Sequence, residues 1–149
     1  MKQKESAEQQ RVASVDDYPL AEKRPELVKT ARGTSLDELT LDAVEQGRVT
    51  LEDLRITPQA LRDQARIAEL AGRSTLARNF ERAAEIVDVP QELLLRVYEL
   101  LRPGRAKGKA ELLEVAATLR TTYGAVAMAA FVEEAAEVYE RRGMFLARY

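Results

Sequence analysis

The sequence of 149 residues contains no cysteine, no histidine and no tryptophan. Without cysteine the chain has no disulfide, no thiolate nucleophile and no thiolate ligand for a metal, which fits a reducing cytoplasm. Without histidine it lacks the commonest general base and the commonest ligand of transition metals. We therefore expect no catalytic, cofactor-binding or metal-binding residues in this chain.

The low net charge and the lack of long apolar runs limit which partners the chain can have. The formal net charge is only -2, which gives no electrostatic reason to expect nucleic acid or an anionic membrane. No run reaches the roughly 18 apolar residues of a membrane span, and the first ten residues carry charge but no apolar stretch of a secretory signal. The composition, 46% hydrophobic and 32% charged with 5% aromatic residues, is typical of a soluble globular protein with an aliphatic core.

The chain divides into a polar tail and a patterned remainder. Residues 1–16 are polar and unpatterned, so we expect a disordered or weakly ordered tail rather than a targeting or docking arm. Residues 17–149 are predicted to form a single helical domain. Tyr18 and Leu20 lie in an extended arm, because Pro19 disfavours helical backbone at the residue before it. This arm is expected to tuck against a surface, which could belong to this chain or to a partner.

Helix-start signals are dense before residue 58. Each places a Ser or Thr where its hydroxyl can accept from an unpaired backbone N–H of the first helical turn. Helices this short are not stable alone, so they must lie on something larger. The signals are Ser35–Glu38, Thr40–Gly47, Thr50–Asp53 and Thr57–Pro58.

After about residue 57 the apolar residues recur with a helical period, and no strand pattern is evident. The sequence predicts an all-α fold with four longer helices packed after about residue 57, preceded by short helical turns and the extended N-terminal arm. Asp88 is placed to cap one of these helices, with Gln91 at its third position. The expected core-facing stripes are Leu76, Phe80, Ala83, Ala84 and Val87; Leu93, Leu94, Val97, Leu100 and Leu101; Leu112, Ala116, Leu119 and Tyr123; and Phe131, Ala135, Val138 and Tyr139.

Acidic pairs are the remaining candidates for a metal or for acid–base chemistry. They are Asp16–Asp17, Glu81 with Glu85, and Glu133–Glu134. Adjacent acids point apart on a helix, the Glu81 and Glu85 pair has arginines beside it, and no calcium-loop spacing occurs. We interpret all three as charged surface.

Two other stretches have a plain interpretation and a functional alternative. The loop from Pro103 to Gly108 is basic and contains glycine but lacks the spacing of a phosphate loop, so we favour a solvated loop over an anion contact. The alanine-rich run Ala125–Ala136 is interpreted as a core helix, with packing on another subunit as the alternative.

A helix-turn-helix outline spans Pro58–Ile86, with Gly72 between two short helices. Several arginines there could touch phosphate, but acids are interleaved with them, and Glu69 and Arg73 are spaced as i,i+4 partners. A mixed, salt-bridged surface is therefore favoured. A helical adaptor or helix-turn-helix DNA-binding protein is the alternative function.

A series of short motifs runs from Asp17 to Arg142 in a fixed order. They are Asp17–Leu20, Pro25–Glu26 with Val28–Ala31, Leu36–Asp37, Arg55–Pro58, Gln64–Ala65, Ala71–Arg73, Asn79–Glu85, Val89–Pro90, Leu101–Pro103, Ala130–Val132 and Glu134–Ala136. Taken together, this series resembles the small (gamma) subunit of the adenosylcobalamin-dependent diol and glycerol dehydratases.

The resemblance implies a complex of large, medium and small subunits, commonly doubled, which is a lyase. Such a complex converts propane-1,2-diol to propanal, or glycerol to 3-hydroxypropanal, by radical chemistry. Adenosylcobalamin is then bound by the partner subunits and not by this chain, whose part is to support assembly. The isolated chain is expected to be inactive and cytoplasmic, and packaging in a bacterial microcompartment is left open.

The resemblance also implies that part of this chain's surface contacts the large subunit. Charged residues in such motifs serve either as helix caps and intrahelical pairs or as interface anchors, and both interpretations stay open here. The residues expected at the partner interface are Tyr18, Leu20, Arg55, Arg73, Asn79, Glu81 and Arg82.

Overall fold

The structure of the chain, a computed structural model, describes residues 12–145. Across this range it contains seven α-helices and four 3₁₀ helices, and its only β interaction is an isolated bridge between Lys29 and Ser35. The predicted all-α fold class is confirmed. The chain falls into two compact units, Met1–Ala84 and Glu85–Tyr149.

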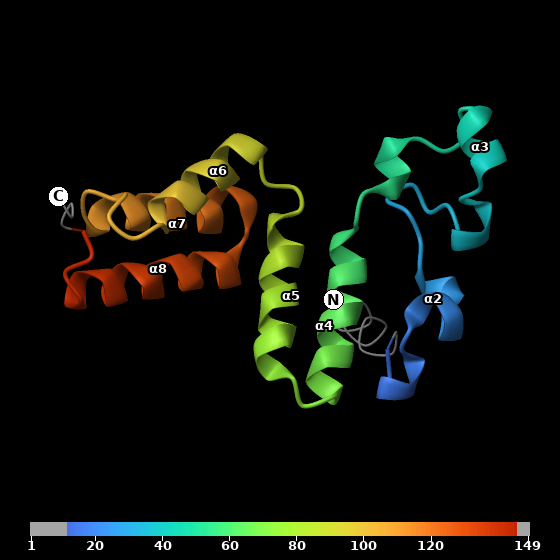
Figure 1. Cartoon of the computed structure of the whole chain (residues 1–149), viewed down its shortest axis with the longest axis horizontal. Coiled ribbons are helices and arrows are strands. Elements are labelled where there is room, and N and C mark those ends of the chain that lie inside the picture. Colours follow the sequence, from blue (N-terminus) through green and yellow to red (C-terminus); the bar gives the residue numbers. More distant parts are fainter. Residues whose placement is uncertain (1–11, 146–149) are drawn as a thin grey trace. The chain divides into compact units, whose positions relative to one another are not determined.

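The first unit is built mostly from short helices, which Figure 1 shows in blue to green. Their caps are the local signals of the sequence. Ser35 and Thr50 each close a capping box, and the Thr57 hydroxyl accepts from the backbone N–H of Ala60 at 3.1 Å. The elements are η1 (Val15–Asp17), α2 (Leu20–Lys23), η2 (Pro25–Leu27), η3 (Leu36–Glu38), α3 (Leu41–Glu45), η4 (Leu51–Leu54), α4 (Pro58–Leu70) and all but the last turn of α5 (Ser74–Ile86).

The first unit has a small apolar cluster formed by Val12, Leu20 and Ile67. Ile67 comes from α4, so the cluster ties the start of the described chain to the longest helix of this unit. Val12 is only 1% exposed. The last residues of the predicted 1–16 tail therefore belong to the fold, and residues 1–11 of that tail lie outside the described residues.

The second unit contains three long helices, which are α6 (Gln91–Leu100), α7 (Lys109–Tyr123) and α8 (Val126–Arg141). Gly124 ends α7 with a φ of 66°, a left-handed conformation that glycine adopts without a steric cost. The chain then turns back at once, and α8 packs along α7 (Figure 1).

Five helices of at least ten residues follow Thr57, one more than the four that the sequence predicted. The two helices on either side of Gly72 agree with the predicted helix-turn-helix outline, since this glycine has a φ of 71° and follows the end of the first one. The helix predicted to be capped by Asp88 in fact begins at Gln91, with Pro90 as its N-cap residue. A proline disfavours helical backbone at the residue before it, which here is Val89, so the helix starts later.

The core of the second unit is aliphatic and rich in alanine. The stripe on α7 was largely predicted correctly, although Tyr123 is 37% exposed. The stripe on α8 was partly correct, because Tyr139 packs against the core but Phe131 is 39% exposed. The fully buried residues of α8 are Ala129, Val132 and Ala136. The core residues are Val89, Val97, Ala106, Leu112, Val115, Ala116, Leu119, Ala125, Ala129, Val132 and Ala136.

Candidate functional site

A buried carboxylate organises the part of the first unit that precedes α4. The side chain of Asp53 in η4 has no exposed surface and accepts from the Thr50 backbone N–H at 2.9 Å. The guanidinium of Arg32 donates to both carboxylate oxygens of Asp53, and it also donates to the backbone carbonyl of Arg48 at 2.9 Å. The hydrogen bonds from Arg32 and then from Thr50 hold the pKa of Asp53 well below its usual value. Three segments, around Arg32, Arg48 and Asp53, are thereby tied together by polar contacts.

The two predicted contact residues of the N-terminal arm differ in exposure. Leu20 is 6% exposed and packs with Val12 and Ile67, so the surface that covers it belongs to this chain. Tyr18 is 55% exposed. Of the two side chains, only that of Tyr18 is accessible to a partner.

Arg55, the next predicted contact residue, follows η4 and lies on the surface. Its guanidinium forms an ion pair with Glu52 at 3.3 Å, and both side chains are well exposed. Such exposed i,i+3 pairs contribute little to stability, so either side chain can re-form its contacts on a partner at small cost.

The other four predicted contact residues belong to or border α5. Within α5, the Arg82 guanidinium donates to the side-chain oxygen of Asn79, an intrahelical interaction. Arg73 was predicted to pair with Glu69, but no such ion pair forms within the described range. Because α4 ends at Leu70, Arg73 lies beyond the helix and the i,i+4 spacing no longer applies. Arg73, Asn79 and four neighbouring residues line an open hollow of about 530 Å³.

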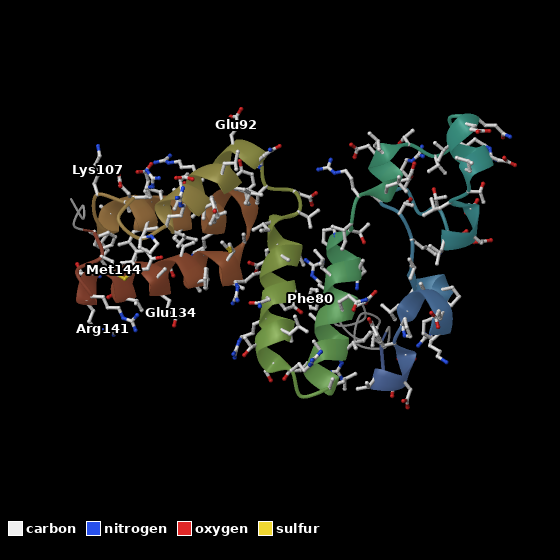
Figure 2. All side chains as sticks on the ribbon, viewed as in Figure 1. Phe80, Glu92, Lys107, Glu134, Arg141 and Met144 are labelled. Atoms are coloured by element: carbon white, nitrogen blue, oxygen red, sulfur yellow. The ribbon has the colours of Figure 1, made fainter. Side chains whose placement is uncertain are left out.

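One member of each acidic pair has a structural partner: Asp17, Glu133 and Glu85. Asp17 accepts from the backbone N–H groups of Ala13 and Ser14, at 2.9 and 3.1 Å, and these bonds lower its pKa. Glu133 binds Arg120 of α7 at 2.7 Å, whereas Glu134 points from α8 away from α7 (Figure 2). Among the described residues, no three acidic side chains come together as a metal site would require.

Glu85 has a specific structural partner. Its two carboxylate oxygens accept from the backbone N–H groups of Ala127 and Met128, at 3.0 and 2.8 Å. These donors lie in the first turn of α8, whose own N-cap residue, Ala125, supplies no side-chain cap. A carboxylate placed there satisfies two unpaired donors and opposes the positive end of the helix dipole. Glu85 was noticed in the sequence as one of an acidic pair, but its partner lies 42 residues away.

Three of the four cations in and beside the basic loop from Pro103 to Gly108 are paired within the chain. Arg102 and Arg105 both approach Glu99, at 3.0 and 3.9 Å. Lys109, at the start of α7, lies 2.6 Å from Glu137 and 2.8 Å from Glu140. The side chain of Lys107, by contrast, is exposed and makes no ion pair within residues 12–145. The exposure of Arg105 and Lys107 supports a solvated loop.

The described residues also offer little to a small molecule. A second open hollow of about 420 Å³ is lined by Lys29, Arg62 and the start of α4, with both cations at its surface. In the range 12–145, no buried side-chain nitrogen or oxygen lacks a hydrogen-bond partner. No helix in that range is long and apolar enough to cross a bilayer.

Comparison with known proteins shows which family the chain belongs to. Residues 13–146 match the model of the dehydratase small subunit family. The chain belongs to this family. It is 53% identical over 132 residues to the propanediol dehydratase small subunit of Salmonella typhimurium, a match that covers 89% of this chain and 76% of that protein. It is 52% identical over 130 residues to the propanediol dehydratase small subunit of Citrobacter freundii, covering 87% and 75%.

The polar interactions that matter in this structure are Arg32 with Asp53 and Glu85 with the start of α8. Sequence reasoning identified Asp53 as part of a capping box but missed Arg32, which precedes it by 21 residues and carries no local signal.

Proposed function

We propose that this chain is the non-catalytic small subunit of an adenosylcobalamin-dependent dehydratase, and that it supports assembly with a large and a medium subunit. The complex would convert propane-1,2-diol to propanal, or glycerol to 3-hydroxypropanal, each with loss of one water. The observation that carries the proposal is the identity of about half of all aligned residues to two propanediol dehydratase small subunits.

The residues of this chain do not fit the cofactor. The sequence contains no histidine to ligate cobalt. Within residues 12–145, the buried polar side chains already have partners, so none is left for an absent group. We therefore assign adenosylcobalamin to the partner subunits and route no step of the reaction through this chain.

What this chain would contribute is a rigid surface. The Arg32–Asp53 contact and the caps of the short helices fix the backbone before α4. The α7–α8 core does the same for the second unit. Preorganised surfaces lose less conformational entropy on association than flexible ones do, which favours stable assembly. We place the complex in the cytoplasm.

We propose the partner surface to include Tyr18, Arg55, Arg73, Asn79, Glu81 and Arg82. Tyrosine and arginine are enriched among the residues that dominate binding energy at protein interfaces. Tyr18 and Arg73 are exposed, and neither has a hydrogen bond or ion pair from its side chain in the described part of the chain. Leu20 can act only indirectly, by holding the arm that presents Tyr18.

The proposal is tested by reconstitution. The large and medium subunits encoded with this chain are purified with and without it, loaded with adenosylcobalamin, and assayed for aldehyde from propane-1,2-diol and glycerol. We expect the chain alone to form no aldehyde, to co-elute with the large subunit, and to raise the yield of active complex. Aldehyde formation by the isolated chain, or its elution as a separate monomer beside the other subunits, would overturn the proposal. A flat titration of the chain against DNA at low salt excludes the helix-turn-helix alternative.

A further inference from the structure

The segment between η3 and α4 carries an unusual number of exposed apolar side chains. Fourteen large apolar side chains are exposed in the described range, and five of them fall within the sixteen residues from 41 to 56. We call these five residues the 41–56 surface. They are Leu41, Val44, Leu51, Leu54 and Ile56, with exposures of 72%, 48%, 82%, 61% and 56%.

Local geometry places most of these side chains in pairs. Leu51 and Leu54 occupy positions i and i+3 of the 3₁₀ helix η4, where side chains three apart are eclipsed on one face. Leu41 and Val44 are also three apart, on α3, and so are neighbours on that helix. The backbone N–H groups of Arg48 and Val49 both donate to the carbonyl of Ala43, at 2.8 and 3.1 Å, which holds the start of the η4 region against the end of α3.

The exposure is not the result of a loose backbone. Asp53, between Leu51 and Leu54 in sequence, points inward and is held by Arg32 and Thr50. The usual arrangement is therefore inverted, with the charged side chain of η4 inside and its leucines outside. A polar network that turns leucines toward solvent leaves their hydrophobic free energy unrealised until another surface covers them.

The charge around the 41–56 surface narrows the choice of occupant. Between residues 36 and 56 there are five exposed carboxylates and two exposed guanidiniums, a net charge of -3 without the buried Asp53. Nucleic acid and anionic lipid would be repelled by this charge. A second copy of the chain would bring two like-charged segments together, which is also unfavourable. A protein surface with an apolar centre and basic residues around it remains.

We propose that the 41–56 surface docks onto the large dehydratase subunit, on an apolar patch of that subunit rimmed by lysine or arginine. The proposal rests on the proposed function, since it takes the dehydratase complex as given. It adds a surface that lies mostly outside the contact residues named above, with only Arg55 within its span. Leu51 and Leu54 form its centre because they share one face and are the most exposed pair three residues apart.

The test compares two matched double variants of the full chain. In L51S/L54S the centre of the 41–56 surface is made polar. In the control L95S/Y98S, two side chains of α6 that are also three apart and similarly exposed, at 55% and 61%, are changed in the same way. Each variant is checked by circular dichroism and thermal unfolding, and its Kd for the purified large subunit is measured.

We expect L51S/L54S to bind at least tenfold more weakly than the wild type, and L95S/Y98S to bind like the wild type. Wild-type affinity in L51S/L54S, or equal losses in both variants, would overturn the inference while leaving the proposed function intact. A wild-type chain that does not bind the large subunit would overturn both. Self-association of the wild type that L51S/L54S abolishes, with binding to the large subunit unchanged, would assign the surface to a second copy instead.

A charge variant tests the same surface without altering any apolar side chain. D42K/E45K reverses two exposed carboxylates of α3. We expect it to weaken binding several-fold at low salt, with the difference from the wild type shrinking as ionic strength rises. Tighter binding by D42K/E45K would mean that the partner surface is acidic, which would contradict the proposed chemistry.

Discussion

Arg32 binds the buried carboxylate of Asp53 across 21 residues of sequence, and its Nε donates to Oδ1 at 2.7 Å. The Asp53 side chain is fully buried, whereas that of Arg32 is half exposed. The pair therefore lies at the edge of the structure, with the acid inside and the base covering it. Thr50 completes the site through its backbone N–H.

This relationship predicts a pH-dependent stability. Because the pKa of Asp53 is lowered from its ordinary value of 3.8, the folded state favours the ionised carboxylate. The stabilisation is then fully present above pH 3.8 and is lost as the pH falls from there toward the lower, folded-state pKa. We expect Asp53→Asn to lower the Tm by several degrees at neutral pH, and the gap from the wild type to narrow as the pH falls below 3.8.

Thermal unfolding of both proteins across this pH range checks the prediction. Other carboxylates with lowered pKa values, such as Asp17 and Glu38, shift both curves equally, so the difference between the two proteins isolates Asp53. Glu45→Gln, which removes an exposed carboxylate of α3, is the control and should change the Tm little. A Tm difference for Asp53→Asn that stays constant with pH would show that the charge of Asp53 does not matter.

The parts of this fold that could be read from the sequence are the local ones. A helix cap joins residues three apart, so Thr40 and Thr57 could be assigned their roles from spacing alone, and both accept from the expected backbone N–H. Arg32 could not be assigned, because nothing in its neighbourhood specifies a partner 21 residues later. The same holds for Glu85, whose partners at the start of α8 come together only when the second unit folds.

The register of α8 shows a second limit. Apolar residues with a helical period occur on more than one face of this helix, and the sequence-based prediction favoured the large Phe131, which is 39% exposed. The structure instead buries Ala129 and Ala136, at 0% exposure, against the leucines of α7. Close helix packing selects small side chains opposite large ones, which periodicity alone does not reveal. The exposure of Leu51 could not be predicted either, because the sequence does not show which leucines are buried by tertiary packing.

The close packing of α7 and α8 predicts that leucine substitutions at two adjacent alanines of α8 change the free energy of unfolding by very different amounts. Ala129 has no exposed surface, whereas Ala130 is exposed. Ala129→Leu inserts three extra carbons into a filled core, and we expect it to lower the free energy of unfolding by about 1–3 kcal/mol. Ala130→Leu should change it by no more than about 0.5 kcal/mol. Urea unfolding of both variants is the measurement, and equal effects would mean that α8 is rotated from the register described.

Substitution of Arg73 is expected to weaken assembly with the large subunit and to leave folding unchanged. Its side chain is exposed and forms no ion pair within residues 12–145, so Arg73→Ala should leave the Tm of the isolated chain unchanged. If Arg73 anchors the partner interface, we expect its removal to weaken binding to the large subunit roughly fivefold. Arg66→Ala, which removes an exposed arginine of α4, is the matched control. Unchanged affinity in Arg73→Ala would remove this residue from the proposed contact surface.

Glu85 and Glu81 lie one turn apart on α5, and their substitution by alanine is expected to affect the free energy of unfolding differently. Glu85 accepts from two backbone N–H groups in the first turn of α8, whereas Glu81 is exposed and has no interaction within the described range. Glu85→Ala leaves those two donors without this partner, and we expect a loss of about 1–2 kcal/mol in the free energy of unfolding. Glu81→Ala should be neutral within about 0.5 kcal/mol.

Glu85→Gln separates the hydrogen bonds from the charge. The amide keeps one acceptor oxygen for the start of α8 but loses the second acceptor and the negative charge that opposes the helix dipole. We expect its stability to lie between those of the wild type and Glu85→Ala. Added salt should narrow the gap between Glu85→Gln and the wild type in proportion to the dipole contribution, because only that contribution is screened. If the gap does not change with salt, the two hydrogen bonds account for the whole effect of Glu85.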